Sequence, residues 1–153
     1  MVRLTDLTTA MRSVVASVAA TAVEPKPWVN VRRREAATVA LISSAGLGVR
    51  GDPLFRGGDG DYREIPHGAP DADVLMSHVS VNYDRTAYQL DLETVLPRRR
   101  LAELASAGVI GAAADTHYSF MGASAPEQMQ TQAQTLASTL HARGVNAAVL
   151  LPV

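Results

Sequence analysis

Short apolar runs alternate along the chain with longer segments of helical periodicity. Residues 38–43 are apolar on both faces and rich in β-branched side chains, which is typical of a core strand covered by helices on both sides. The run 146–151 has the same character, and 109–114 indicates a short strand or a sheet edge. We expect another strand over 73–81, with polar residues at its carboxyl end. Its buried residues are expected to be Val74, Leu75 and Met76.

Three segments have helical spacing. The first covers 7–22 and is ended by the proline-containing stretch 24–28, because proline lacks a backbone donor and restricts the residue before it. The second covers 97–107 and the third 126–143, and a glycine follows each of these two helices as a stop signal.

Strands that alternate with helices favour a mostly parallel, layered sheet. The sequence therefore predicts an α/β fold, an open sheet with flanking helices that is incomplete at its carboxyl-terminal end. The helix and proline-containing lead-in occupy 1–37, and the α/β domain occupies 38–153. Within that domain, glycine and aspartate dominate 45–61, which predicts a long loop.

Composition narrows the function classes. The chain has 153 residues, 47% of them hydrophobic and 19% charged, as expected for one globular domain. A net charge of −1 gives no basic field, so no nucleic-acid or anionic membrane partner is expected. The absence of cysteine excludes disulfides, thiolate metal sites and a cysteine nucleophile within these residues. Because no apolar stretch is long enough to span a membrane and the amino end does not resemble a signal peptide, a cytoplasmic location is expected.

Glycines at 46, 48 and 51 match the spacing of a dinucleotide-binding motif and follow a predicted strand. That motif requires a helix to open at its third glycine, so that backbone amides face a pyrophosphate. Here Asp52 and Pro53 follow directly and prevent a helix from starting. A nicotinamide or flavin cofactor is therefore not expected, and no metal-ligand cluster or catalytic triad is visible.

His78 and His117 are the candidate acid–base residues, because an imidazole near a strand end can exchange protons or donate to a carboxylate at neutral pH. A structural hydrogen-bonding role is the alternative for each. Arg85 could bind a substrate carboxylate with its planar fork, or pair with Asp84 in a surface turn. His67 and His141 have structural explanations in a loop and at a helix end.

Several segments together resemble the selenoprotein B family of glycine, sarcosine, betaine and D-proline reductases. The resemblance covers roughly residues 39–153, and its most specific segment is His117-Tyr118-Ser119-Phe120-Met121-Gly122. The other matching segments are 39–46, Arg50-Gly51-Asp52-Pro53, Tyr62-Arg63-Glu64-Ile65-Pro66 and Ser77-His78-Val79.

Members of that family reductively cleave a carbon–nitrogen bond. The resemblance implies a selenocysteine, or a cysteine, directly after Val153, and a pyruvoyl group on a partner subunit that holds the substrate amine. Because the sequence stops at Val153, two explanations are open: a selenoprotein read only to an unrecoded UGA codon, which we favour, or a short homologue with another role. The 153 residues alone are not expected to catalyse the family's reaction.

Within this resemblance, His117 and His78 would donate or shuttle protons. Arg85 would bind a carboxylate, Asp84 beside it is also expected among the substrate-binding residues, and Tyr118 and Ser119 would position a small amine or amino-acid substrate. The loop 46–61, the strand end 77–85 and the segment 117–122 are expected to converge beside Val153. The alternative function is a non-catalytic binding or assembly subunit of the same fold. In either case we expect a protein partner subunit or a homo-oligomer.

Overall fold

The computed structural model describes residues 3–17, 33–81 and 83–153, in two compact units, Met1–Asn30 and Val31–Val153. The first unit contains the short 3-10 helix η1 (Leu4–Asp6) and the helix α1 (Thr9–Ser17). In it, the guanidinium of Arg12 donates to three backbone carbonyls of the preceding turns. Residues 18–22 of the helix expected over 7–22 lie outside the described residues, and so does the proline-containing stretch 24–28.

The second unit contains a five-stranded sheet whose pairings are mostly parallel. Its strands are β1 (Thr38–Ser43), β3 (Tyr62–Pro66), β5 (Ala112–Ala113), β6 (Thr116–Phe120) and β7 (Ala147–Leu151). Strand β1 pairs in parallel with β5, β6 and β7, while β3 pairs antiparallel with β6. The expected α/β fold with a mostly parallel sheet and flanking helices is confirmed.

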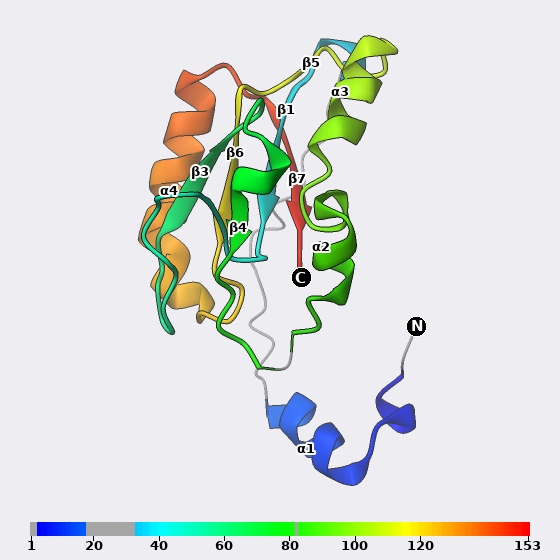
Figure 1. Ribbon diagram of the computed structural model, residues 1–153, viewed down its shortest axis with the longest axis vertical. Coiled ribbons are helices and arrows are strands. Elements are labelled where there is room, and N and C mark those ends of the chain that lie inside the picture. Colours follow the sequence, from blue (N-terminus) through cyan, green and yellow to red (C-terminus); the bar gives the residue numbers. More distant parts are fainter. Residues whose placement is uncertain (1–2, 18–32, 82) are drawn as a thin grey trace. The chain divides into compact units, whose positions relative to one another are not determined.

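Strand β1 is the centre of this sheet. Val39 pairs with both Ala113 and Ala147, so β5 and β7 lie on opposite edges of β1. Further along, Ile42 pairs with Tyr118 of β6 and with a residue of β7, so β5 and β6 share one edge of β1 in succession. Strand β7 consequently has β1 on one side and no strand of the described chain on the other (Figure 1).

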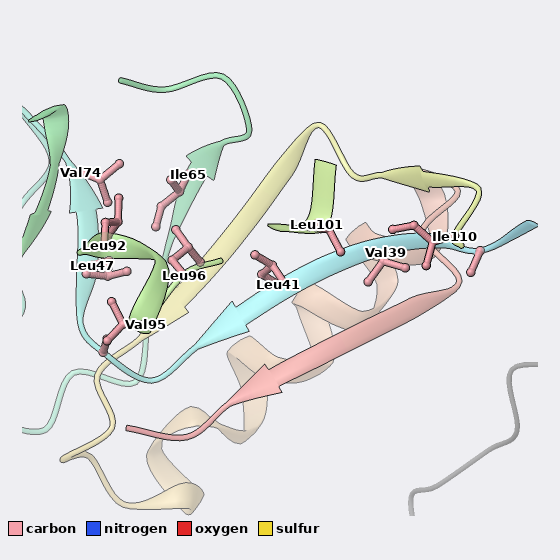
Figure 2. Packing of buried hydrophobic residues seen from close by; sticks show 12 residues of the cluster. Val39, Leu41, Leu47, Ile65, Val74, Leu92, Val95, Leu96, Leu101 and Ile110 are labelled. Atoms are coloured by element: carbon pink, nitrogen blue, oxygen red, sulfur yellow. The ribbon is translucent and has the colours of Figure 1, made fainter. Parts of the chain in front are cut away.

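Helices cover both faces of the sheet, as Figure 1 shows. On one face, α4 (Pro126–Ala142) packs Leu136 against Tyr118 and Phe120 of β6. On the other face lie α2 (Thr86–Leu90), η4 (Leu92–Thr94) and α3 (Arg98–Ser106). Figure 2 shows this second layer, in which Leu41 of β1 and Leu101 of α3 belong to one buried cluster. The expected helices over 97–107 and 126–143 are confirmed.

The prediction of a strand over 73–81 is wrong in two respects, the length of the strand and the sheet to which it belongs. Only β4 (Val74–Met76) forms, and it pairs antiparallel with β2 (Leu47–Val49) in a separate two-stranded sheet. Residues 47–49, which were expected to lie in a loop, form the partner strand of β4. Val74 is buried as expected, but the side chain of Leu75 is 37% exposed. Residues 77–85 therefore do not follow a strand of the main sheet.

Most of the segment 115–122 forms β6. Strand β6 lies between β1 and β3, and four of its five residues are buried. Two further 3-10 turns, η2 (Arg34–Ala36) and η3 (Asp71–Asp73), precede β1 and β4 respectively.

In the described part of the chain, no helix is long and apolar enough to cross a membrane.

Candidate functional site

A small pocket lies where the chain leaves β6 and β7. Its volume is about 210 Å³. It is lined by residues that follow β4, β6 and β7 in the sequence, namely His78, Ser80, Tyr83, Gly122, Ala123 and Val153. Three segments that are far apart in the sequence therefore meet at one place, and that place is the carboxyl end of parallel strands, where open α/β sheets bind ligands.

Ser44, just after β1, ties the strand ends together. Its hydroxyl accepts a hydrogen bond from the backbone N–H of Val153 at 2.9 Å, and its carbonyl accepts one from Gly122 at 2.9 Å. A Cβ atom on Gly122 would lie 2.7 Å from the carbonyl oxygen of Ser44. Glycine at 122 therefore allows the close approach that forms this wall of the pocket.

Gly46 places His78 beside the strand ends. Its backbone has φ +66°, a left-handed conformation, and a Cβ atom there would lie 3.1 Å from the Cα of His78. The carbonyl of Gly46 accepts a hydrogen bond from the backbone N–H of Ser77 at 2.8 Å. The turn after β1 thus holds the chain after β4 against it.

The imidazole of His78 is buried, and only one of its two ring nitrogens has a hydrogen-bond partner among the described residues. Its Nδ1 accepts a hydrogen bond from the backbone N–H of Ser80 at 3.2 Å, and its ring packs 4.7 Å from the ring of Tyr83. The side chain is 7% exposed, and its Nε2 has no hydrogen-bond partner in the described part of the chain. Burial, and then the positive charge of Arg85, lower the pKa of His78 below its ordinary value.

Arg85 stabilises the loop that carries His78 by donating hydrogen bonds to its backbone carbonyls. One Nη atom donates to the carbonyls of His78 at 2.6 Å and Ser80 at 3.1 Å, and the other donates to the carbonyl of Tyr83 at 3.5 Å. Both ends of the guanidinium fork are thus engaged by backbone carbonyls. The expected role of Arg85 in binding a substrate carboxylate through this fork does not fit the arrangement.

Asp84 does not pair with Arg85 in the described structure. Its carboxylate accepts a hydrogen bond from the backbone N–H of Thr86 at 2.9 Å, at the start of α2. The two hydrogen bonds from Thr86 hold the pKa of the Asp84 carboxyl below its usual value. This side chain is part of a turn, and it does not line the pocket.

His117 lies elsewhere, in the interior between β1, β3 and α3. It is fully buried, and its Nδ1 accepts a hydrogen bond from the backbone N–H of Leu41 at 3.2 Å. Its Nε2 lies 2.8 Å from Nδ1 of His67. Because Nδ1 of His117 is an acceptor, its proton is on Nε2 and is donated to His67. Burial, and then the charges of His67 and Arg98, lower the pKa of His117 to about 4.

Tyr118 and Ser119 point to opposite faces of β6, because successive side chains of a strand alternate. The Tyr118 hydroxyl accepts a hydrogen bond from Arg143 at 2.8 Å, and burial raises its pKa. The Ser119 hydroxyl accepts one from the backbone N–H of Leu47 at 2.9 Å. Neither residue lines the pocket near Val153.

The expected convergence is therefore correct for part of the site. His78, Ser80, Tyr83 and Gly122 line one pocket with Val153, and Gly46 contacts His78. His117, Tyr118 and Ser119 do not, since they belong to the interior of the sheet. Tyr83 lies within the 77–85 segment expected there, whereas Ala123 was not predicted as a pocket residue, and the only signal for it was its position three residues after the end of β6.

Other hollows of the surface are larger, with volumes of about 420, 530 and 280 Å³. The first lies along α2 and η4, the second beside Tyr118 and Arg143, and the third beside His67 and Arg98. In the third, Arg98 is buried and its Nε has no partner among the described residues, but its other nitrogens donate to Asp71 and to two carbonyls. This guanidinium holds the loop before β4, which is a structural task.

The described residues contain no group of three histidine, aspartate or glutamate side chains that could hold a metal ion. No protein-family model, no characterised protein and no solved structure matches the chain. The geometry of the pocket and the resemblance of the segments around it are therefore the basis for a functional proposal.

Proposed function

We propose that this chain forms the amino-terminal part of a substrate-reducing subunit similar to the glycine, sarcosine, betaine and D-proline reductases. The observation that supports the proposal best is the pocket at the end of β7. Val153 lines it, and so does His78, whose buried Nε2 has no partner among the residues that the structure describes. A residue after Val153 would start from the wall of this pocket.

The proposed chemistry is the reductive cleavage of a carbon–nitrogen bond in a small amine or amino acid, with two electrons and two protons supplied by an external reductant and the amine released. A selenocysteine or cysteine after Val153, together with a pyruvoyl group of a partner subunit, would supply the nucleophile and the amine-holding group. The residues of this chain fit such a nucleophile in one respect: Ser44 fixes the backbone of Val153 through two hydrogen bonds. A fixed strand end restricts where the next side chain can lie.

The described residues take three roles in this proposal. His78 contacts the ligand, Arg85 and Gly46 hold the loop that carries His78, and Ser44 positions the end of β7. His117 has no place at the pocket and stabilises the interior of the sheet.

The gene and the native protein test this function. We expect a UGA codon after the codon for Val153, followed in frame by a further strand and helix pattern. We also expect the native protein to have a mass beyond Val153 and to contain selenium or an added cysteine. A different stop codon, or no further reading frame of this kind, would contradict the proposal.

The second candidate is a non-catalytic binding or assembly subunit, and the edge strand β7 favours it. Leu150 of β7 is 61% exposed and Val149 is 42% exposed, so an apolar strand edge is open to another chain. A native mass that ends at Val153, with concentration-dependent association, would support this function. We expect Leu150→Lys to weaken that association in sedimentation experiments.

Leu54→Lys is the matched control, because Leu54 is 70% exposed but lies in a loop away from the sheet edge. The same loss of association in both variants, or a monodisperse wild-type monomer at micromolar concentration, would remove the assembly function.

A further inference from the structure

The hydrogen bonds of His78 determine where its proton lies. Nδ1 accepts from the backbone N–H of Ser80, so it carries a lone pair and no proton. In the neutral ring the proton is then on Nε2. This N–H is buried and has no partner in the described part of the chain, although His78 lines the pocket.

We propose that His78 binds a small ligand in this pocket through Nε2–H, which donates a hydrogen bond to a carboxylate or carbonyl oxygen. The inference rests on the proposed function for the choice of this pocket as the site. It goes further by assigning the ligand group that His78 contacts and by making His78 a fixed donor, where the sequence predicts an acid–base residue.

The same hydrogen bonds argue against proton transfer by His78. A second proton would have to bind at Nδ1, which would break the hydrogen bond from Ser80, and the nearby charge of Arg85 also opposes it. Loss of the Nε2 proton would leave an anionic imidazole in a buried position, which is more costly still. A donor that neither gains nor loses its proton is suited to binding an oxygen acceptor.

The surroundings of His78 favour an oxygen acceptor over a cation. None of the side chains that line the pocket is acidic, and the guanidinium of Arg85 donates a hydrogen bond to the carbonyl of His78. The volume of about 210 Å³ is below the roughly 300–1,000 Å³ of pockets for drug-sized ligands. The pocket therefore suits a ligand of few atoms.

Histidine side-chain NMR on the full chain tests this inference. We expect His78 to be in the Nε2–H form, and we expect its Nε2 resonance to shift on addition of acetate or of acetamide. Tetramethylammonium chloride, a cation without an acceptor, is expected to leave it unchanged. Acetamide keeps the acceptor oxygen without charge, so the two acceptors together distinguish a carboxylate site from a carbonyl site.

Two substitutions separate the nitrogens of the ring. His78→Asn keeps an acceptor for the Ser80 N–H but lacks the distal donor, so we expect roughly fivefold weaker binding of the better probe, followed through the Gly122 amide. His78→Gln places an amide N–H near the former Nε2 and should restore most of the binding. His141→Asn, on the exposed end of α4, should bind as the wild type does.

An Nδ1–H form of His78, no response to either acceptor, or equal binding by His78→Asn and wild type would overturn the inference. The proposed function is tested separately by the native mass and by carbon–nitrogen cleavage. Absence of cleavage with intact acceptor binding at His78 would remove only the function. Cleavage with unchanged binding by His78→Asn would remove only the role of His78.

Discussion

His117 and His78 are both buried, and both have a pKa below that of an ordinary histidine, but their hydrogen bonds differ. His117 has both ring nitrogens engaged, by Leu41 and by His67. His78 has only Nδ1 engaged, while its Nε2 is buried and unpaired among the described residues. An unsatisfied buried donor costs about 1–3 kcal/mol, so its presence needs a reason.

The two histidines thus differ in a property other than burial or the direction of the pKa shift, namely whether both ring nitrogens have a partner among the described residues. The His117 ring completes the interior, because it links β1, β6 and the loop after β3. The His78 ring lies at a pocket, and its Nε2 has no partner among the described residues. Functional sites commonly keep such unfavourable features, which are offset by stability elsewhere.

The largest expected effect is that of His117→Asn on stability. The shorter side chain can still accept from the Leu41 N–H, but it loses the hydrogen bond to His67 and leaves a cavity in a fully buried position. We expect the free energy of unfolding to fall by about 3 kcal/mol in urea denaturation. His141→Asn should change it by less than about 0.5 kcal/mol. A similar small change for His117→Asn would show that the buried pair is not structural.

The second expected effect is a pH dependence of the free energy of unfolding that is caused by the titration of His117. Its pKa is about 4 in the folded protein against 6.5 ordinarily, so between these values the unfolded chain binds a proton that the folded chain does not. The stability from the neutral ring is fully present above about pH 6.5 and is lost as the pH falls toward 4. That loss is on the order of 3 kcal/mol.

Urea unfolding at several pH values between 7 and 4 measures this loss, and His117→Asn is the reference because it cannot titrate. The difference in stability between wild type and variant should shrink as the pH falls. A constant difference would show that His117 does not contribute to acid destabilisation.

The third expected effect concerns the wall of the pocket. In Gly122→Ala the new Cβ would lie 2.7 Å from the carbonyl oxygen of Ser44, and a backbone atom cannot move as easily as a side chain. We expect a loss of about 2 kcal/mol of stability and an altered His78 resonance. Gly57→Ala is the control, because a Cβ at Gly57 meets no atom within 4 Å. Equal stability of both variants would contradict the close approach of the strand ends.

Local patterns were sufficient to predict β1, β7, α3 and α4. Strand β1 and the two helices have buried positions of the expected spacing, and glycine marks the ends of both helices. Strand β7 was expected to be a core strand, but among the described strands it lies at the sheet edge and none of its residues is fully buried. Strand β6 was not predicted, because its sequence is polar at His117 and Ser119, whose side chains accept hydrogen bonds from the backbone N–H groups of Leu41 in β1 and Leu47 in β2. The pairing of β2 with β4 was also missed, because it depends on two three-residue strands that meet only in the tertiary structure.

From the sequence, only those residues of the candidate site could be predicted that follow an expected strand. His78 was found because it follows an apolar run, although that run forms a strand outside the main sheet. The partner of His117 could not be found, because His67 is 50 residues away and no periodic pattern links the two. The role of Arg85 likewise depends on which carbonyls the loop turns inward, and that is a property of the folded loop.

The smallest expected effect is the one that tests the comparison most directly. His78→Asn makes the same chemical change as His117→Asn, keeps an acceptor for the Ser80 N–H, and removes the unpaired donor. Because no hydrogen bond from Nε2 is lost, we expect the free energy of unfolding to change by less than about 1 kcal/mol. Urea denaturation beside His117→Asn measures both. A loss at His78 as large as that at His117 would mean that the two histidines do the same structural work, and the distinction between them would fail.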